Sequence, residues 1–117
     1  MIETRPAEAT TTRAAMPSAV AYIDDEHAIV VKNLPDASIG VIDIPCRKPE
    51  DLSYLVRIVD EIGPRRRVAI LGPDRLRLEL EREYVTLYRR PDLLVDVEES
   101  DGETAAHLID RLEELSS

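Results

Sequence analysis

The fold of this chain is decided by residues 39–71, IGVIDIPCRKPEDLSYLVRIVDEIGPRRRVAIL. Residues 39–44 and 68–71 are short apolar runs rich in β-branched side chains and bounded by Pro or Gly, which is typical of buried strands. Between them, apolar residues recur at helical spacing and form one stripe: Leu52, Leu55, Val56, Val59 and Ile62. We therefore predict a strand, a helix over residues 49–62 and a second strand, with the two strands side by side and parallel and the crossover between them right-handed.

The two ends of this predicted helix carry residue types that helix ends favour. Pro49 suits the first turn, where its missing N–H would have no partner, and Glu50 and Asp51 follow where the helix dipole favours negative charge. Gly63-Pro64 ends the helix, because Gly tolerates a left-handed cap and Pro cannot continue the helix.

Further strands are predicted around this unit, two before it that are joined by a hairpin loop and two after it: residues 19–23, 28–32, 84–88 and 93–97. Residues 74–83 stay open between helix and strand, because Leu alternates with charged residues whereas the composition favours a helix. The last apolar stripe predicts a helix over residues 103–115. The fold class is therefore α/β or α+β, a single small domain with a mixed sheet of five to six strands and two main helices, 49–62 and 103–115.

Composition bounds the class of protein. The chain has 117 residues, which supports one domain, 19–117, preceded by an N-terminal arm, 1–18, that we expect to be disordered because it shows no apolar periodicity. One Cys provides no disulfide, and no apolar run approaches the roughly 18 residues of a membrane span, so we expect a cytoplasmic protein without membrane contact. A net charge of −9 with 13 Arg against 2 Lys indicates a GC-rich genome or a salt-adapted, halophilic cytoplasm.

The best candidate ligand site in the sequence lies where the two core strands end. In sheets with parallel strands, ligands favour the crevice past the carboxyl ends of the strands. The residues there are Asp43, Cys46, Arg47, Asp74 and Arg75. A thiol near a helix N-terminus, beside carboxylate and guanidinium groups, would suit anion binding or thiol chemistry. The structural alternative is that Cys46 packs in the core, and that Asp43 faces solvent or pairs with Arg67 or Arg75.

Other reactive side chains favour structural roles. Residues 25–27, Asp-Glu-His, could ligate a hard cation, but a solvated hairpin loop is the simpler interpretation because only one His is present there. His107, with Glu103 and Arg111 four residues to either side, indicates a surface network. The sequence contains no Gly-rich phosphate loop, no nucleophile elbow and no Cys/His set for zinc, so we predict no cofactor and no metal.

Charge is distributed unevenly along the chain. The net charge is −4 over residues 1–46, +3 over residues 47–90 and −8 over residues 91–117. The basic side chains that could form an interaction surface are Arg65, Arg66, Arg67, Arg89 and Arg90. Nucleic acid is a weak candidate partner for them, because the chain is acidic and lacks Phe and Trp platforms. The acidic C-terminal segment could instead cover them within one chain or meet them in a neighbouring copy.

These features favour a non-catalytic protein-interaction or assembly module that associates with itself or with another protein. Two alternatives stay open at this point. One is an enzyme or a small-ligand and anion binder that uses Asp43, Cys46, Arg47 and Asp74. The other is a domain that binds nucleic acid or another polyanion through Arg65 to Arg67.

Overall fold

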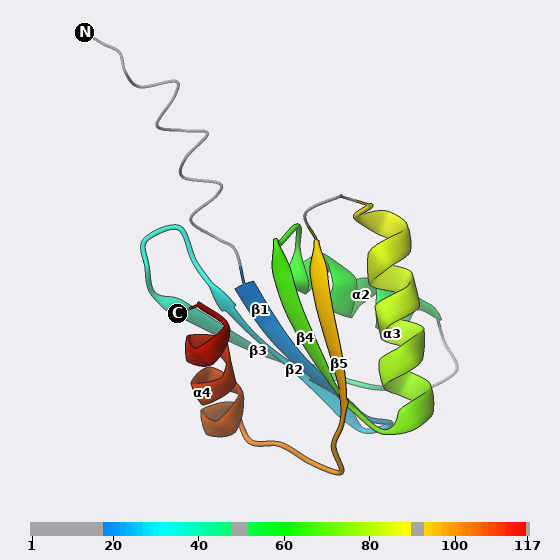
Figure 1. Ribbon diagram of the computed structural model, residues 1–117. Helices are drawn as coiled ribbons and strands as arrows, with labels where there is room; N and C mark the ends of the chain where they lie inside the picture. The colour runs from blue at the N-terminus through cyan, green and yellow to red at the C-terminus, as the bar shows by residue number, and fades with distance from the viewer. Residues whose placement is uncertain (1–17, 48–51, 90–92, 117) are drawn as a thin grey trace, which may run out of the picture.

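The computed structural model describes residues 18–47, 52–89 and 93–116, which form one five-stranded mixed sheet and three helices (Figure 1). The strands are β1 (Ser18–Ile23), β2 (His27–Asn33), β3 (Ile39–Pro45), β4 (Arg67–Gly72) and β5 (Leu94–Glu99). The helices are α2 (Leu52–Ile62), α3 (Asp74–Leu87) and α4 (Ala105–Ser116). The predicted fold class, a small α/β domain with five to six strands, is confirmed, and α3 adds a third helix to the two predicted.

The strand order is β3-β2-β1-β4-β5. β1 pairs antiparallel with β2, which pairs antiparallel with β3, whereas β4 pairs parallel with both β1 and β5. β3 and β4 therefore run in the same direction, but the prediction that they lie side by side is wrong, because β2 and β1 separate them. The physical reason is burial: β1 is buried along its whole length and takes the centre of the sheet, while β3, which carries Asp43, is partly exposed and lies at an edge.

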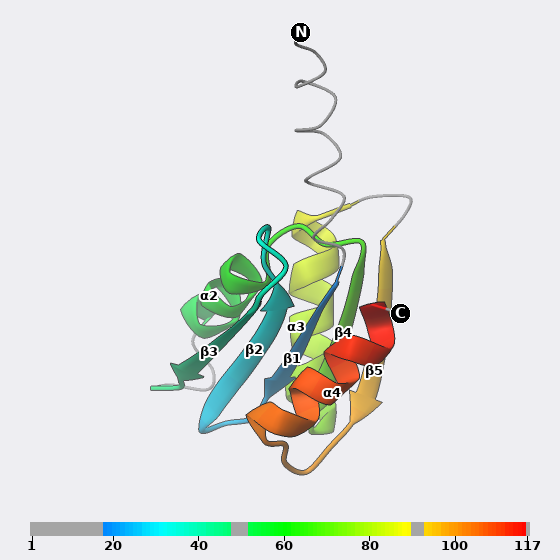
Figure 2. The same cartoon turned by 90° about the vertical axis from the view of Figure 1, so that its left-hand side faces the viewer.

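The sheet is covered unequally on its two faces. α2 and α3 lie on one face and α4 lies alone on the other among the described helices (Figure 2). Alternate residues of each strand feed two separate cores. The core under α4 contains Val20, Tyr22, Ile29, Val31, Ala69, Leu71, Leu108, Leu112 and Leu115. Because α4 packs mainly on β1 and β2, the side of this face formed by β4 and β5 has less cover.

Residues 74–83, which were open between helix and strand, are helical, and the predicted strand over residues 84–88 is wrong because α3 continues to Leu87. Leu76, Leu80 and Tyr84 follow helical spacing and are buried. The Tyr84 hydroxyl donates to the Gly63 carbonyl at 2.7 Å and accepts the Arg65 N–H at 3.0 Å. These long-range contacts fix a helix where β-branched and aromatic residues alone favoured a strand.

The helix α2 confirms the predicted helix and most of its predicted apolar stripe. Its buried residues are Tyr54, Leu55, Ile58, Val59 and Ile62. Leu52 and Val56, which were placed on the stripe, are 57% and 43% exposed. The helix ends as predicted, with Gly63 at φ +69° and its N–H donating to the Val59 carbonyl at 3.0 Å. Pro49, Glu50 and Asp51 lie outside the described residues, as does most of the predicted N-terminal arm.

In the part of the chain that the structure describes, no helix is long and apolar enough to cross a membrane.

Candidate functional site

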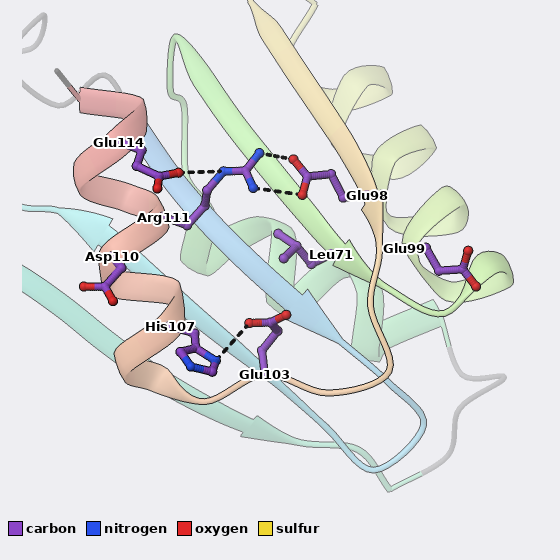
Figure 3. Close-up of a pocket in the computed structure, with 8 residues that line it drawn as sticks. All are labelled: Leu71, Glu98, Glu99, Glu103, His107, Asp110, Arg111 and Glu114. Atoms are coloured by element: carbon purple, nitrogen blue, oxygen red, sulfur yellow. Dashed lines mark hydrogen bonds and ion pairs between the residues drawn. The ribbon is translucent and has the colours of Figure 1, made fainter.

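An open crevice lies between α4 and the β4–β5 side of the sheet, with a volume of about 290 Å³ (Figure 3). It forms because α4 covers β1 and β2 and leaves the neighbouring strands less protected. The residues that line it are Leu71, Glu98, Glu99, Glu103, His107, Asp110, Arg111 and Glu114.

Strand register explains which side chains reach this crevice. Leu71 pairs with Glu98 across the β4–β5 ladder, and Ala69 pairs with Asp96. Because Ala69 and Leu71 belong to the core under α4, Asp96 and Glu98 lie on that same face of the sheet. On α4, the buried residues Leu108, Leu112 and Leu115 face the sheet. His107, Arg111 and Glu114 precede them by one position each and border the crevice along one flank of the helix.

The crevice carries more negative than positive charge. Its lining includes five carboxylates, at Glu98, Glu99, Glu103, Asp110 and Glu114, and the single guanidinium of Arg111. Arg111 Nη1 donates to Glu98 Oε1 at 2.8 Å, and its Nη2 contacts Glu98 Oε2, so one carboxylate takes both ends of the guanidinium. Glu103 and Glu114 lie at the opening beside His107 and Arg111, whereas the carboxylates of Glu99 and Asp110 point away from it at the rim (Figure 3). A positively charged group is therefore the natural occupant of this surface.

The predicted network around His107 is present in part. His107 Nδ1 lies 3.7 Å from Glu103 Oε1, while Arg111 turns to Glu98 and, at 3.8 Å, to Glu114. Among the described residues, no group of three or more His, Cys, Asp or Glu side chains could hold a metal ion.

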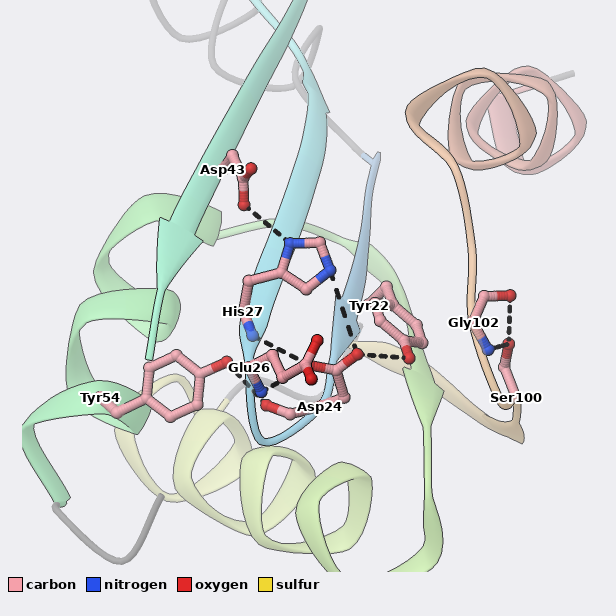
Figure 4. Close-up of polar contacts among 8 residues, drawn as sticks. All are labelled: Tyr22, Asp24, Glu26, His27, Asp43, Tyr54, Ser100 and Gly102. Atoms are coloured by element: carbon pink, nitrogen blue, oxygen red, sulfur yellow. Dashed lines mark hydrogen bonds and ion pairs between the residues drawn. The ribbon is translucent and has the colours of Figure 1, made fainter. Parts of the chain in front are cut away.

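A second polar cluster closes the β1–β2 hairpin (Figure 4). Asp24 Oδ1 accepts the N–H groups of Glu26 at 2.7 Å and His27 at 2.9 Å, and Asp24 Oδ2 accepts the Tyr22 hydroxyl at 2.8 Å. Burial alone would raise the pKa of Asp24, but these hydrogen bonds outweigh it and hold the pKa below its usual value. The Tyr54 hydroxyl donates to the Asp24 carbonyl at 2.9 Å, which ties α2 to the same turn.

The residues predicted for ligand binding at the carboxyl edge do not converge. Asp43 is exposed and lies 3.1 Å from His27 Nδ1, so it pairs with neither Arg67 nor Arg75. Cys46 is half-buried against the core under α2 and α3, whereas Asp43 lies on the α4 face. The remaining three residues are exposed: Arg47 follows β3, Asp74 pairs with Arg77 at 2.6 Å, and Arg75 pairs with Glu79 at 3.3 Å. Ligand binding by these residues stays a prediction.

The five predicted interaction arginines do not form one surface. Arg65 is 5% exposed, and its guanidinium donates to the carbonyls of Ile62 at 2.8 Å and Asn33 at 2.7 Å. Burial lowers the pKa of this guanidinium from its usual value. Arg67 Nη2 lies 3.5 Å from Asp96 Oδ2, so the basic middle of the chain meets the acidic C-terminal segment within one molecule. The other members are Arg66 and Arg89, which are exposed, and Arg90, which lies outside the described residues.

Glu103, His107 and Arg111 were identified from sequence as a surface network, whereas the crevice residues of β5 were not, although a signal for them was present. Asp96 and Glu98 alternate with Val95 and Val97 in a run that is otherwise typical of a strand, and this alternation indicates a polar face. What the sequence lacks is the position of α4, because the packing of that helix over β1 and β2 depends on contacts far apart in the chain.

No protein-family model matches the chain, and no curated protein matches it. Solved structures do match, among them that of Pelota from Archaeoglobus fulgidus, with a TM-score of 0.54 and 11% sequence identity. The match covers 97% of this chain and 37% of the Pelota chain, so this chain spans little more than a third of that protein. At this identity, the likeness shows the fold alone.

Proposed function

We propose that this protein is a non-catalytic protein-interaction domain that binds a positively charged segment of a protein partner in the crevice between α4 and β5. The observation that carries this proposal is the half-covered sheet face, where an open crevice holds five carboxylates and one guanidinium. Complementary charge would orient and accelerate the approach of a basic segment. Leu71, at the floor of the crevice, offers apolar contact to the stem of a Lys or Arg side chain.

The charge of the whole C-terminal part supports the same proposal. Residues 93–116 contain eight acidic side chains and one Arg. Their field extends beyond the crevice and would raise the local concentration of a cationic partner. The cavity volume of about 290 Å³ falls at the lower limit of small-molecule pockets, roughly 300–1,000 Å³, and it suits one or two side chains of a peptide.

The test is direct binding of a fluorescent Arg- and Lys-rich peptide, measured by anisotropy against a Glu-rich peptide of equal length. We expect the basic peptide to bind, and the double variant Glu103→Lys and Glu114→Lys, at two carboxylates that lie at the opening, to lose that binding. Asp60 is exposed on α2, which covers the other face of the sheet. The charge reversal Asp60→Lys is therefore the control and should leave binding unchanged. Equal loss in both variants, or no preference for the basic peptide, would contradict the proposal.

A further inference from the structure

The two edge strands of the sheet differ in how well they are protected against pairing with another strand. Within the described residues, β3 and β5 each have a neighbour on one side only. β5 carries Asp96, Glu98 and Glu99, and like charges facing each other destabilise a strand pair. β3 carries a single charge, Asp43, and Val41 at its middle is 47% exposed. β3 is therefore the edge that remains open to pairing.

Within the part of the chain that the structure describes, the backbone of β3 presents a definite set of groups that no other strand pairs. At its two ends, the Cys46 N–H donates to the Glu26 carbonyl at 2.9 Å and the Ser38 carbonyl accepts the Leu34 N–H at 2.9 Å. Even-numbered residues of β3 thus point their N–H and C=O groups at β2. The direction of the main-chain N–H and C=O groups alternates from one residue to the next along an antiparallel strand. Those of Ile39, Val41 and Asp43 therefore point away from the sheet.

One antiparallel register pairs the outward groups of all three residues among themselves. When two copies of β3 pair about a twofold axis at Val41, Val41 lies opposite Val41 and Ile39 lies opposite Asp43, so all outward N–H and C=O groups of these residues pair. A register centred on Asp43 would place two carboxylates opposite each other. A shift toward the β2–β3 turn would use Ala37, whose φ of +74° is incompatible with a strand.

The ends of this edge carry opposite charges that favour the same arrangement. Asp36 is exposed in the turn before β3, and Arg47 is exposed after it. In the antiparallel pair centred on Val41, Arg47 of each copy comes beside Asp36 of the second copy, whereas a parallel pair would bring like charges together.

We propose that the edge of β3 pairs with β3 of a second copy of this chain, so that two five-stranded sheets continue into one across a twofold axis at Val41. This surface is separate from the acidic crevice, and the pairing is tested independently of the proposed binding of basic segments.

The experiment is sedimentation velocity over a dilution series of the full chain. We expect a monomer–dimer equilibrium, and we expect Val41→Lys to raise the dimer dissociation constant at least about tenfold because it places two ammonium groups opposite each other. Leu94→Lys, at a site 59% exposed on the other edge strand, is the matched control and should leave the dimer unchanged. A wild-type monomer at every concentration, or equal effects of the two variants, would overturn the proposal.

Two further variants test the register. Arg47→Glu should weaken the dimer, and adding Asp36→Arg to it should restore the dimer, since the charges are then exchanged between the two ends.

In a Cys46→Ser background, Val41→Cys should form an intermolecular disulfide on mild oxidation, because opposed strand residues lie within disulfide range. Failure of both the charge exchange and the cross-link in a protein that still dimerises would show a different interface.

Discussion

At the scale of single residues, Asp24 is the most heavily engaged carboxylate among the described residues. It accepts two main-chain N–H groups and the Tyr22 hydroxyl, and His27 Nε2 lies 4.0 Å from its Oδ2. The hydrogen bonds favour its ionised form, so the pKa of Asp24 falls below its ordinary value of 3.8. The ionised side chain thus organises the turn between β1 and β2, from which the whole antiparallel half of the sheet extends.

This lowered pKa predicts a pH dependence of stability. A carboxylate whose pKa is lower in the folded state contributes stability that is present above its unfolded pKa and is lost as the pH falls through the folded pKa. We expect Asp24→Asn to destabilise the protein at neutral pH and to flatten the fall of the melting temperature below about pH 4. Thermal melts from neutral to acidic pH would measure this, with Asp25→Asn, an exposed neighbour, as the control. An unchanged acid limb in Asp24→Asn would contradict the assignment.

At the scale of elements, Gly72 shows how closely the central strands approach. It ends β4 with φ +152°, and a Cβ at this position would overlap the main-chain oxygen of Ile23 at the end of β1. The Gly72 carbonyl also accepts the Ser100 N–H at 3.1 Å and Arg77 Nη1 at 3.1 Å. Three elements therefore depend on the backbone geometry of one glycine, because β1, β5 and α3 all meet it.

We predict that Gly72→Ala destabilises the fold by about 2–4 kcal/mol, because backbone atoms must move to admit the added methyl group. Gly102→Ala is the matched control, since a Cβ there would meet no atom within 4 Å. It should change the free energy of unfolding by no more than about 0.5 kcal/mol. Urea denaturation of both variants measures the difference. Equal stability of the two would show that β1 and β4 separate at this end at little cost.

The helices and strands of this fold were predictable where the pattern that indicates them lies within the element itself. The hairpin of β1 and β2, the C-terminal end of α2 and the stripe of α4 follow from periodicity and from residues such as Gly63. The strand that pairs with β3 was not predictable, because the sequence of residues 39–44 does not indicate that β2 and β1 lie between β3 and β4. The helix over residues 84–87 was missed for a similar reason: Tyr84 is held by Gly63 and Arg65, about twenty residues away.

The candidate site was less predictable than the fold. The sequence placed Asp43 and Cys46 at one edge of the sheet, and Asp43 does lie near the end of β3 with Cys46 directly after it, but alternation puts them on opposite faces. It also counted Arg65 as a surface charge, although the side chain is buried and bonded to two carbonyl groups. In both cases the missing information is which face each side chain takes, and that depends on tertiary packing rather than on residue type.

At the scale of the whole molecule, charge is segregated between the two faces of the sheet. Residues 93–116 carry eight acidic side chains and one Arg, whereas residues 52–89, which include α2 and α3, carry six acidic and eight basic side chains. The segment that forms β5 and α4 therefore carries an excess of negative charge. Arg111 with Glu98 and Arg67 with Asp96 are two pairs that partly offset this charge.

This segregation predicts that salt acts with opposite signs on stability and on binding. Screening weakens repulsion between exposed carboxylates, so we expect the free energy of unfolding to rise by on the order of 1 kcal/mol from low to high NaCl concentration. The double neutralisation Glu99→Gln and Asp110→Asn should reduce that rise, whereas Glu79→Gln, which removes an attraction to Arg75, should not. Over the same range, affinity for the basic peptide should fall, because the same screening weakens its attraction to the crevice. Urea denaturation and peptide anisotropy at matched salt concentrations measure both, and a parallel fall of stability and affinity would show that repulsion on the α4 face does not limit the fold.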